Sequence, residues 1–146
     1  DAPSTITRLQ NMGTPDYLIS AATQLVVAQR LARKNCKNCK IPDDDVNPKV
    51  LQDLGFSAEQ ASRVKAIKGK GCETCSNTGY KGRQGIYEIL VVSKPLKEAI
   101  LRKATTPELR QIAVKEGFQT MQDMGKRLIA SGDLNFREYE RVLSGD

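Results

Sequence analysis

The chemistry that this sequence can support centres on its four cysteines, which form two Cys-x-x-Cys pairs: Cys36 with Cys39, and Cys72 with Cys75. Two residues between cysteines let the backbone turn back so that both sulfurs face one centre, and two such knuckles supply four thiolates. Zn²⁺ favours tetrahedral coordination with thiolate ligands at structural sites. Four protein ligands leave no position for a catalytic water. The spacing therefore predicts a structural zinc site.

Three lysines surround the first cysteine pair, at Lys34, Lys37 and Lys40. Their positive charge would offset the negative charge of a tetrathiolate site. We also expect them to lower the thiol pKa values and so to favour the ligating form.

Other uses of paired cysteines compete with zinc. A disulfide framework is disfavoured because the sequence shows no secretion signal and has four cysteines in 146 residues. A thioredoxin-like redox site needs one Cys-x-x-Cys, so a second pair is surplus. An iron–sulfur cluster also uses four thiolates and stays an alternative. The 32 residues between Cys39 and Cys72 exceed the roughly 15–20 of a compact ribbon, so we expect an excursion with its own small helices.

The remaining composition excludes several functional classes. The chain has no histidine, which removes His-based acid–base catalysis, Ser-His and Cys-His nucleophile pairs, and His metal ligands. No apolar run approaches the roughly 20 residues of a membrane-spanning helix. The net charge of +6 is compatible with a nucleic acid, an anionic membrane surface or an acidic protein partner. The abrupt polar start at Asp1 leads us to expect a piece of a longer protein.

Periodicity and capping signals predict an α+β fold with short helices and a small antiparallel strand element at the metal site. Ser4 is a candidate N-cap for the first helix, Ser57 with Gln60 fits a capping box, and Thr106 before Pro107 is a candidate cap. Residues 24–31 are ambiguous between helix and strand. Residues 82–92 are predicted as a strand. The predicted helices are residues 4–12, 17–22, 49–54, 57–64, 96–101 and 108–115, then one between Thr120 and Gly132, and a last one opened by Asn135.

Three motifs in order resemble a known family. GYKGRQGIYEIL (Gly79–Leu90) follows the second cysteine pair, AQRL (Ala28–Leu31) precedes the first, and DAPSTITRLQNMG (Asp1–Gly13) opens the chain. Together they resemble the C-terminal part of the secretion and type IV pilus assembly ATPases, which are cytoplasmic hexameric motors driving pilus extension and type II secretion. The resemblance covers essentially the whole chain and is closest to the pilus-extension subgroup with a tetracysteine site.

The resemblance implies three parts. Residues 1–35 would be the tail of a RecA-like α/β ATPase domain, residues 36–93 a four-cysteine zinc-binding subdomain, and residues 94–146 an all-helical C-terminal subdomain. In the full-length parent it further implies ATP and Mg, a homo-hexamer, and docking to an inner-membrane platform protein. The parent would lie in the cytoplasm at the inner face of the inner membrane, associated peripherally through its partners.

The nucleotide-binding motifs of such a motor are missing from this sequence. It contains no Gly-x-x-x-x-Gly-Lys-[Ser/Thr] loop, and the family's acidic and histidine boxes are also absent. We therefore expect no ATP hydrolysis by this chain alone, and assign it no catalytic or cofactor-binding residues.

Three arginines allow two interpretations each. Arg83, between Gly82 and Gly85, could contact a phosphate or a neighbouring subunit through bidentate bonds. Alternatively, the glycines shape a turn or bulge and Arg83 pairs with Glu88. Arg30 and Arg33 could likewise contact nucleotide or form an interdomain ion pair.

Two functions from different classes follow. The first is a zinc-stabilised structural and coupling module of an assembly ATPase. The second is a nucleic-acid-binding zinc module, suggested by the positive charge and the paired knuckles. Aromatic residues for stacking on bases are few, at 5% of the chain, and the basic residues form no single dense stripe. We therefore favour the ATPase module, with no nucleic-acid partner.

Overall fold

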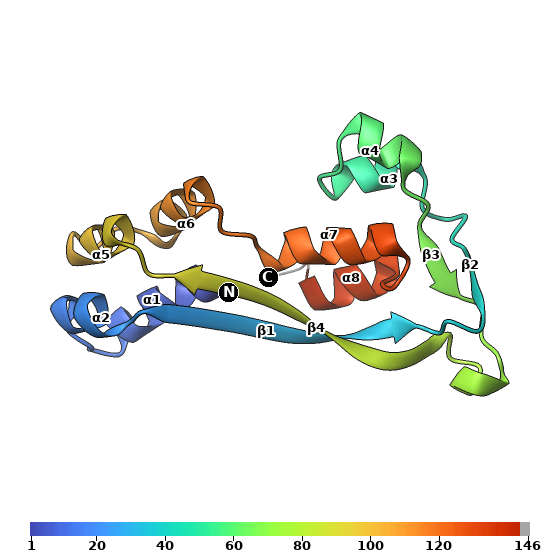
Figure 1. The fold of residues 1–146 in the computed structure, drawn as a ribbon, viewed down its shortest axis with the longest axis horizontal. Coiled ribbons are helices and arrows are strands. Elements are labelled where there is room, and N and C mark those ends of the chain that lie inside the picture. Colours follow the sequence, from blue (N-terminus) through green and yellow to red (C-terminus); the bar gives the residue numbers. More distant parts are fainter. Residues whose placement is uncertain (144–146) are drawn as a thin grey trace. The chain divides into compact units, whose positions relative to one another are not determined.

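The computed structural model of the chain describes residues 1–143, which fall into two compact units. The first unit contains residues 1–29 and 87–121, and the second contains residues 30–86 and those from 122 onward. The elements, in chain order, are α1 (Ala2–Asn11), α2 (Asp16–Ala22), β1 (Leu25–Asn35), β2 (Lys40–Pro42), α3 (Pro48–Asp53), α4 (Ala58–Arg63), β3 (Ile67–Gly69), a 3₁₀ turn η1 (Glu73–Cys75), β4 (Tyr80–Val91), α5 (Lys94–Leu101), α6 (Thr106–Lys115), α7 (Met121–Ser131) and α8 (Phe136–Leu143) (Figure 1). The predicted mixture of helices and small antiparallel sheets is confirmed.

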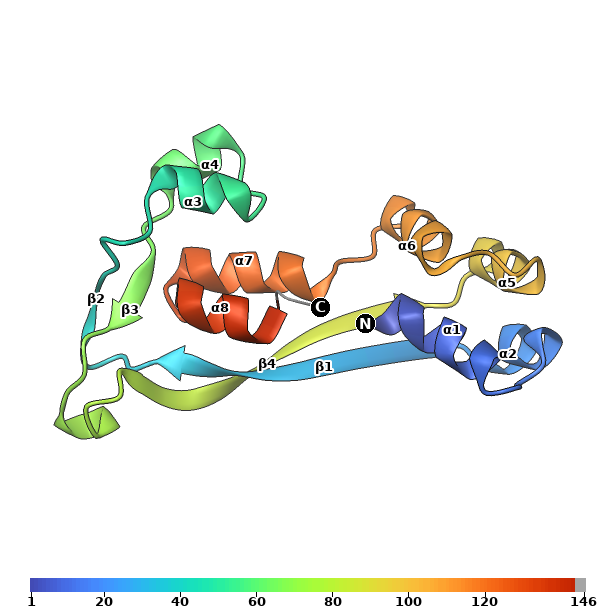
Figure 2. The same ribbon diagram turned by 180° about the vertical axis from the view of Figure 1, so that it is seen from behind.

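Two two-stranded sheets connect these elements. Strands β1 and β4 pair with each other and run in opposite directions, as both views show (Figures 1 and 2). Each of them has residues in both units. Strands β2 and β3 form an antiparallel ribbon in which Lys40 faces Gly69 and Pro42 faces Ile67. The ambiguous stretch is therefore strand from Leu25 onward, as its β-branched side chains allow.

The first unit encloses a core of aliphatic side chains from its helices and from its parts of β1 and β4. These residues include Ala2 and Ile6 in α1, Ile19 in α2, Val26 in β1, Leu90 in β4, Leu96 and Ile100 in α5, and Leu109 and Ala113 in α6. The helical spacing of Leu96 and Ile100 and the alternation along β4 direct these side chains inward. Tyr87, Ile89 and Val91 of β4 alternate with the buried positions and are exposed.

Two helix starts in this unit differ from those predicted by one to three residues. The N-cap of α1 is Asp1, whose Oδ1 accepts from Ser4 N at 2.8 Å, while Ser4 Oγ bonds back to Asp1. Ser4 is thus the third helical residue of a reciprocal capping box, not the cap itself. Thr105 caps α6, one residue before the predicted Thr106. In both places a neighbouring residue with an equivalent side-chain oxygen caps the helix instead.

The second unit carries the excursion between the cysteine pairs and the last two helices. Helices α3 and α4 occur within the excursion as predicted, and Ser57 with Gln60 forms the predicted capping box of α4. Helices α7 and α8 pack closely at Gly125, where a Cβ would lie 2.7 Å from Tyr139 Cε2. Asn135 opens α8 as predicted, because its Oδ1 accepts from Glu138 N at 2.7 Å.

No helix within residues 1–143 has the length and apolar character needed to cross a bilayer. The predicted division at residues 35 and 93 concerns parts of a longer protein and stays a prediction.

Candidate metal centre

The four predicted cysteines come together in the second unit. Cys36 directly follows β1, Cys39 directly precedes β2, Cys72 directly precedes η1, and Cys75 is the last residue of η1. Their sulfur atoms all lie within 4.8 Å of one another. The fold thus brings together all four residues that the sequence singled out.

The sulfur spacing fits one tetrahedral ion. The Sγ–Sγ distances are 3.8 Å for Cys36–Cys72, 3.8 Å for Cys39–Cys75 and 3.7 Å for Cys72–Cys75. A tetrahedron with Zn–S bonds of about 2.3 Å has edges of about 3.8 Å. All four cysteines are free thiols, and the spacing is far above the roughly 2.0 Å of a disulfide. It is also too small for a cluster in which several irons divide the cysteines among them.

Amide groups surround the sulfurs with hydrogen-bond donors. Gly71 N donates to Cys39 Sγ at 3.3 Å, and Gly79 N donates to Cys75 Sγ at 3.2 Å. Asn38 Nδ2, from inside the first knuckle, donates to Cys72 Sγ at 3.4 Å. Donors aimed at sulfur stabilise the thiolate form that binds metal.

These contacts decide the thiol pKa values. The hydrogen bond from Asn38 is the largest influence on Cys72 and helps lower its pKa to about 6. Burial opposes ionisation of Cys75, but the N–H groups of Cys72 and Gly79 outweigh it, so its pKa is lowered. Burial is the main reason that the pKa of Cys39 rises to about 11. The expectation that nearby lysines would lower the pKa values is wrong for Cys39, because its burial dominates.

Two glycines allow the strands beside the knuckles to touch backbone to backbone. A Cβ on Gly69, at the end of β3, would overlap the carbonyl oxygen of Gly79. Gly79 has φ +80°, and its own Cβ would lie against Gly69 O. The same Gly79 oxygen accepts from Cys36 N at 2.9 Å. Because any side chain would separate these backbones, the glycine pair sets the distance between the knuckles.

Asn35 joins the metal site to the turn between α7 and α8. It is buried and immediately precedes the first cysteine. Its Nδ2 donates to Ile67 O at 3.1 Å and to Gly132 O at 3.0 Å, and its backbone N–H donates to Asp133 O at 2.8 Å. One side chain thus connects the end of β1, the β2–β3 ribbon and the helical turn.

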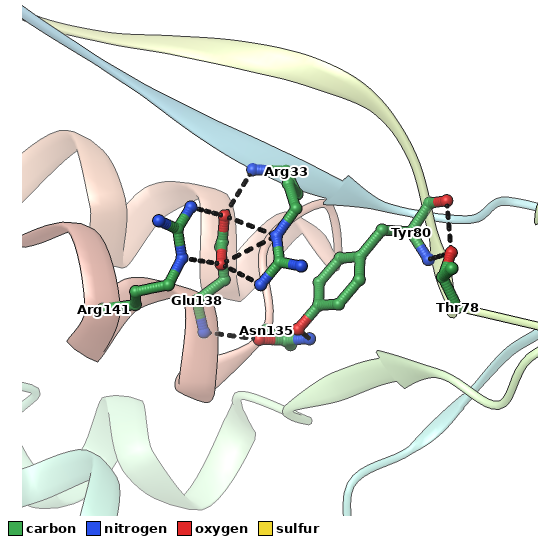
Figure 3. A network of polar contacts seen from close by, with 6 residues as sticks. All are labelled: Arg33, Thr78, Tyr80, Asn135, Glu138 and Arg141. Carbon is green, nitrogen blue, oxygen red and sulfur yellow. Dashed lines mark hydrogen bonds and ion pairs between the residues drawn. The ribbon is translucent and has the colours of Figure 1, made fainter.

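A buried carboxylate provides a second connection (Figure 3). Glu138 on α8 accepts from the backbone N–H of Arg33 at 2.6 Å and from its Nη2 at 2.9 Å. It also accepts from Arg141 Nε at 2.7 Å and Nη2 at 2.6 Å. The guanidinium of Arg33 lies 4.1 Å over the Tyr80 ring, and Tyr80 Oη accepts from Asn135 Nδ2 at 2.9 Å. Strands β1 and β4 are thereby fixed to α8.

The arginine network controls the ionisation of Glu138. Its side chain is fully buried, which by itself would favour the neutral form. The hydrogen bonds from Arg141 and Arg33 outweigh this effect and lower its pKa to about 2. Glu138 is therefore ionised at neutral pH, and its charge is shared between two arginines.

The three arginines that the sequence left open lie in different environments. Arg33 forms the ion pair with Glu138 described above, and Arg30 Nη1 donates to the carbonyl of Val142 near the end of α8. Arg83 is exposed and has no hydrogen bond or ion pair with any residue that the structure describes. Its predicted pairing with Glu88 is wrong, because Glu88 is buried and accepts from Ala2 N at 3.0 Å. Gly82 has φ +85°, which supports the backbone role proposed for the glycines.

Several structural residues escaped sequence reasoning. Asn35 directly precedes the first knuckle and Gly69 lies three residues before the second, but neither Asn35 nor Gly69 is part of a recognisable motif. The pairing of Glu138 with Arg141 follows helical spacing and could have been found. The contact with Arg33 joins residues 105 apart in the chain, so local pattern could not reveal it.

Comparison with known proteins extends the resemblance. Residues 1–141 match the family described as type II/IV secretion system protein. The chain is 36% identical over 138 residues, 94% of its length, to the type IV pilus assembly ATPase PilB of Myxococcus xanthus, and covers 24% of that protein. It is 40% identical over 125 residues, 86% of its length, to PilB of Thermus thermophilus, and covers 14% of it.

Similarity extends to secretion proteins. The chain is 32% identical over 142 residues, 97% of its length, to the type II secretion system protein HxcR of Pseudomonas aeruginosa. It spans only 14% to 26% of the lengths of these three relatives. With a family match covering nearly every residue, the chain belongs to the type II/IV secretion system protein family.

Proposed function

We propose that this chain is the C-terminal part of a cytoplasmic ATPase that powers type IV pilus assembly or type II secretion, and that zinc stabilises it. The names of its relatives support the motor, and the tetrahedral sulfur spacing supports the metal. Cys36, Cys39, Cys72 and Cys75 would hold the ion. Bound zinc would supply four metal–sulfur bonds, which close the base of the excursion and leave no open coordination position.

The observation that carries this proposal is the position of the cysteines where separate segments converge. The first knuckle joins β1 to β2, and the second lies between β3 and β4. Asn35, one residue before the first knuckle, bonds to the α7–α8 turn. An ion at this point would fix the β2–β3 ribbon to the strands that carry α8. The metal would therefore make the second unit one mechanical body, able to transmit motion from a motor core.

The catalytic machinery would lie elsewhere in the parent protein. We propose a RecA-like core whose tail is residues 1–35, with Mg-ATP bound by a P-loop outside this chain. The parent would form a homo-hexamer at the inner face of the inner membrane and dock to a platform protein there. In this proposal residues 94–146 serve as an adaptor or subunit contact, and nucleic acid is not a partner.

Limited proteolysis tests whether bound zinc fixes the base of the excursion, a role that we call the zinc clamp. With metal bound, trypsin should cleave slowly within the excursion, where Lys49 and Lys65 are exposed. After chelation we expect faster cleavage there, because the excursion loses its anchored base. Equal rates with and without chelator would contradict the clamp. Phosphate release from ATP should stay at blank level, and turnover by this chain would contradict the assignment of catalysis to another part.

A further inference from the structure

The positive charge of the chain is concentrated around the cysteines. Residues 34–40 and 65–83 contain seven lysines, one arginine and one glutamate, a net charge of +7, whereas the whole chain carries +6. The rest of the chain is therefore close to neutral. Four thiolates with one divalent ion carry a charge of −2. Compensation of the metal site thus accounts for only a minor part of this positive charge.

Several segments of the second unit carry cations on or near the knuckles. Lys37 lies between Cys36 and Cys39 in the sequence. Lys70 directly follows β3, and its backbone N–H and that of Gly71 donate to Cys39 O and Cys39 Sγ. Lys81 lies two residues after Gly79, whose carbonyl accepts from Cys36 N, and its Nζ donates to Thr74 O at 3.1 Å. The side chain of Lys34 lies along Gly82, the residue that precedes Arg83 in the sequence. We name this group the knuckle face: Lys34, Lys37, Lys70, Lys81 and Arg83.

The knuckle face is not neutralised within the chain. Lys37, Lys70, Lys81 and Arg83 are exposed. None of the five cations makes an ion pair with a residue in the described range 1–143. By contrast, Lys40 beside them pairs with Asp133 at 3.4 Å. The five unpaired charges are therefore available to an external anion.

The groups between these cations indicate the kind of anion. Asn38, Thr74, Ser76 and Asn77 are exposed and polar, and lie on or beside the two knuckles. Ser76 and Asn77 have φ values of +54° and +61°, which turn the chain sharply at this surface. Such groups can match the backbone amides and carboxylates of a polypeptide, with charge steering the encounter and hydrogen bonds giving specificity.

An anionic membrane and a nucleic acid fit this surface less well. The exposed large apolar residues of the described chain lie elsewhere, at positions such as Leu31 on β1 and Val91 on β4, so the knuckles offer nothing to insert into a bilayer. Tyr80, the aromatic residue nearest the second knuckle in sequence, is covered by the guanidinium of Arg33. That face of the Tyr80 ring is therefore closed to a stacking nucleobase.

We propose that the knuckle face is a docking surface for an acidic segment of a partner protein. This proposal rests on the proposed function. It adds to that function the face of the chain that an acidic segment of a platform or regulatory protein would contact. The metal site would act here as a scaffold that holds the cations at fixed positions, so that fewer degrees of freedom are lost on binding.

Binding of a fluorescein-labelled oligoglutamate peptide, followed by anisotropy, tests this surface in the whole chain. The test variant is Lys37→Gln/Lys70→Gln/Lys81→Gln. Its matched control, Lys94→Gln/Lys103→Gln/Lys115→Gln, removes the same charge from exposed positions in the first unit. Metal content and circular dichroism confirm first that both variants are folded. We expect about tenfold weaker binding for the test variant and about twofold or less for the control.

Four other outcomes overturn the proposal. Equal weakening in both variants would mean that net charge alone attracts the peptide. Absence of peptide binding would remove the surface. Tighter binding through the same lysines to phosphatidylglycerol-containing vesicles would reassign it to a membrane, and tighter binding to duplex DNA would reassign it to nucleic acid. Lysine-dependent peptide binding by a chain without metal would contradict the zinc clamp but leave this surface intact, so the two failures are distinguishable.

Discussion

Replacing Glu138 with glutamine removes the buried carboxylate on which Arg33 and Arg141 converge. Glutamine has nearly the same shape, but its amide nitrogen would present donors to the guanidinium donors and its oxygen carries no charge. Two arginines would then face each other across an uncharged group. We expect the variant to fold with a lower free energy of unfolding, because the charge-assisted bonds that hold α8 to β1 and β4 are lost.

The size of this loss follows from the pKa of the carboxyl. Lowering it from its ordinary value of 4.5 to about 2 corresponds to about 3 kcal/mol of interaction in favour of the charged form. The arginine side chains are 49% and 55% exposed, so solvent screens part of this attraction. We therefore expect Glu138→Gln to cost about 2 kcal/mol at neutral pH.

Urea unfolding followed by far-ultraviolet circular dichroism measures the cost. The control is Glu59→Gln, which breaks an exposed ion pair with Arg63 on α4 and should change stability by about 0.5 kcal/mol or less. A carboxyl whose folded pKa is depressed stabilises the protein above its unfolded pKa. As the pH is lowered from 4.5 to about 2, the free energy of unfolding of the wild type should therefore decrease more steeply than that of Glu138→Gln. A loss no larger than that of the control, or parallel pH profiles, would refute the role assigned to Glu138.

Two glycine substitutions give further predictions. Gly69→Ala places a Cβ on the carbonyl oxygen of Gly79. We therefore expect about 2 kcal/mol or more of destabilisation and faster metal loss to a competing chelator. Unchanged metal retention would contradict the role of the glycine pair in setting the distance between the knuckles. Gly125→Ala places a Cβ against Tyr139 and Leu143, so we expect about 1–3 kcal/mol of destabilisation with metal retention unchanged. Metal loss in this second variant would mean that α7–α8 packing and the cysteine site are coupled more tightly than their contacts indicate.

Local sequence signals predicted the elements and the cysteine cluster because each depends on short spacings. Two Cys-x-x-Cys pairs define their own knuckles, and Ser57 with Gln60 or Asn135 with Glu138 define helix starts within three residues. Pattern alone did not decide the structure of residues 24–31, which form strand from Leu25 onward. Their apolar run fits either structure, and pairing with β4, far along the chain, determines the outcome.

The long-range polar contacts within each unit could not be read from the sequence. The Asn35 amide bonds to Gly132 across 97 residues, and Ala2 N to Glu88 across 86 residues. Each is one polar contact between segments that carry no shared pattern. The error at Arg83 has the same origin, because proximity in sequence suggested Glu88 as partner while the fold buries that carboxylate against α1.

Metal content of the untagged protein, measured by plasma mass spectrometry together with thermal unfolding in chelator, tests the central claim most directly. We predict about one zinc per chain, with a marked loss of stability on chelation, since four cysteines at tetrahedral spacing form one closed site. Absence of zinc, with four titratable thiols and an unchanged unfolding temperature, would contradict it.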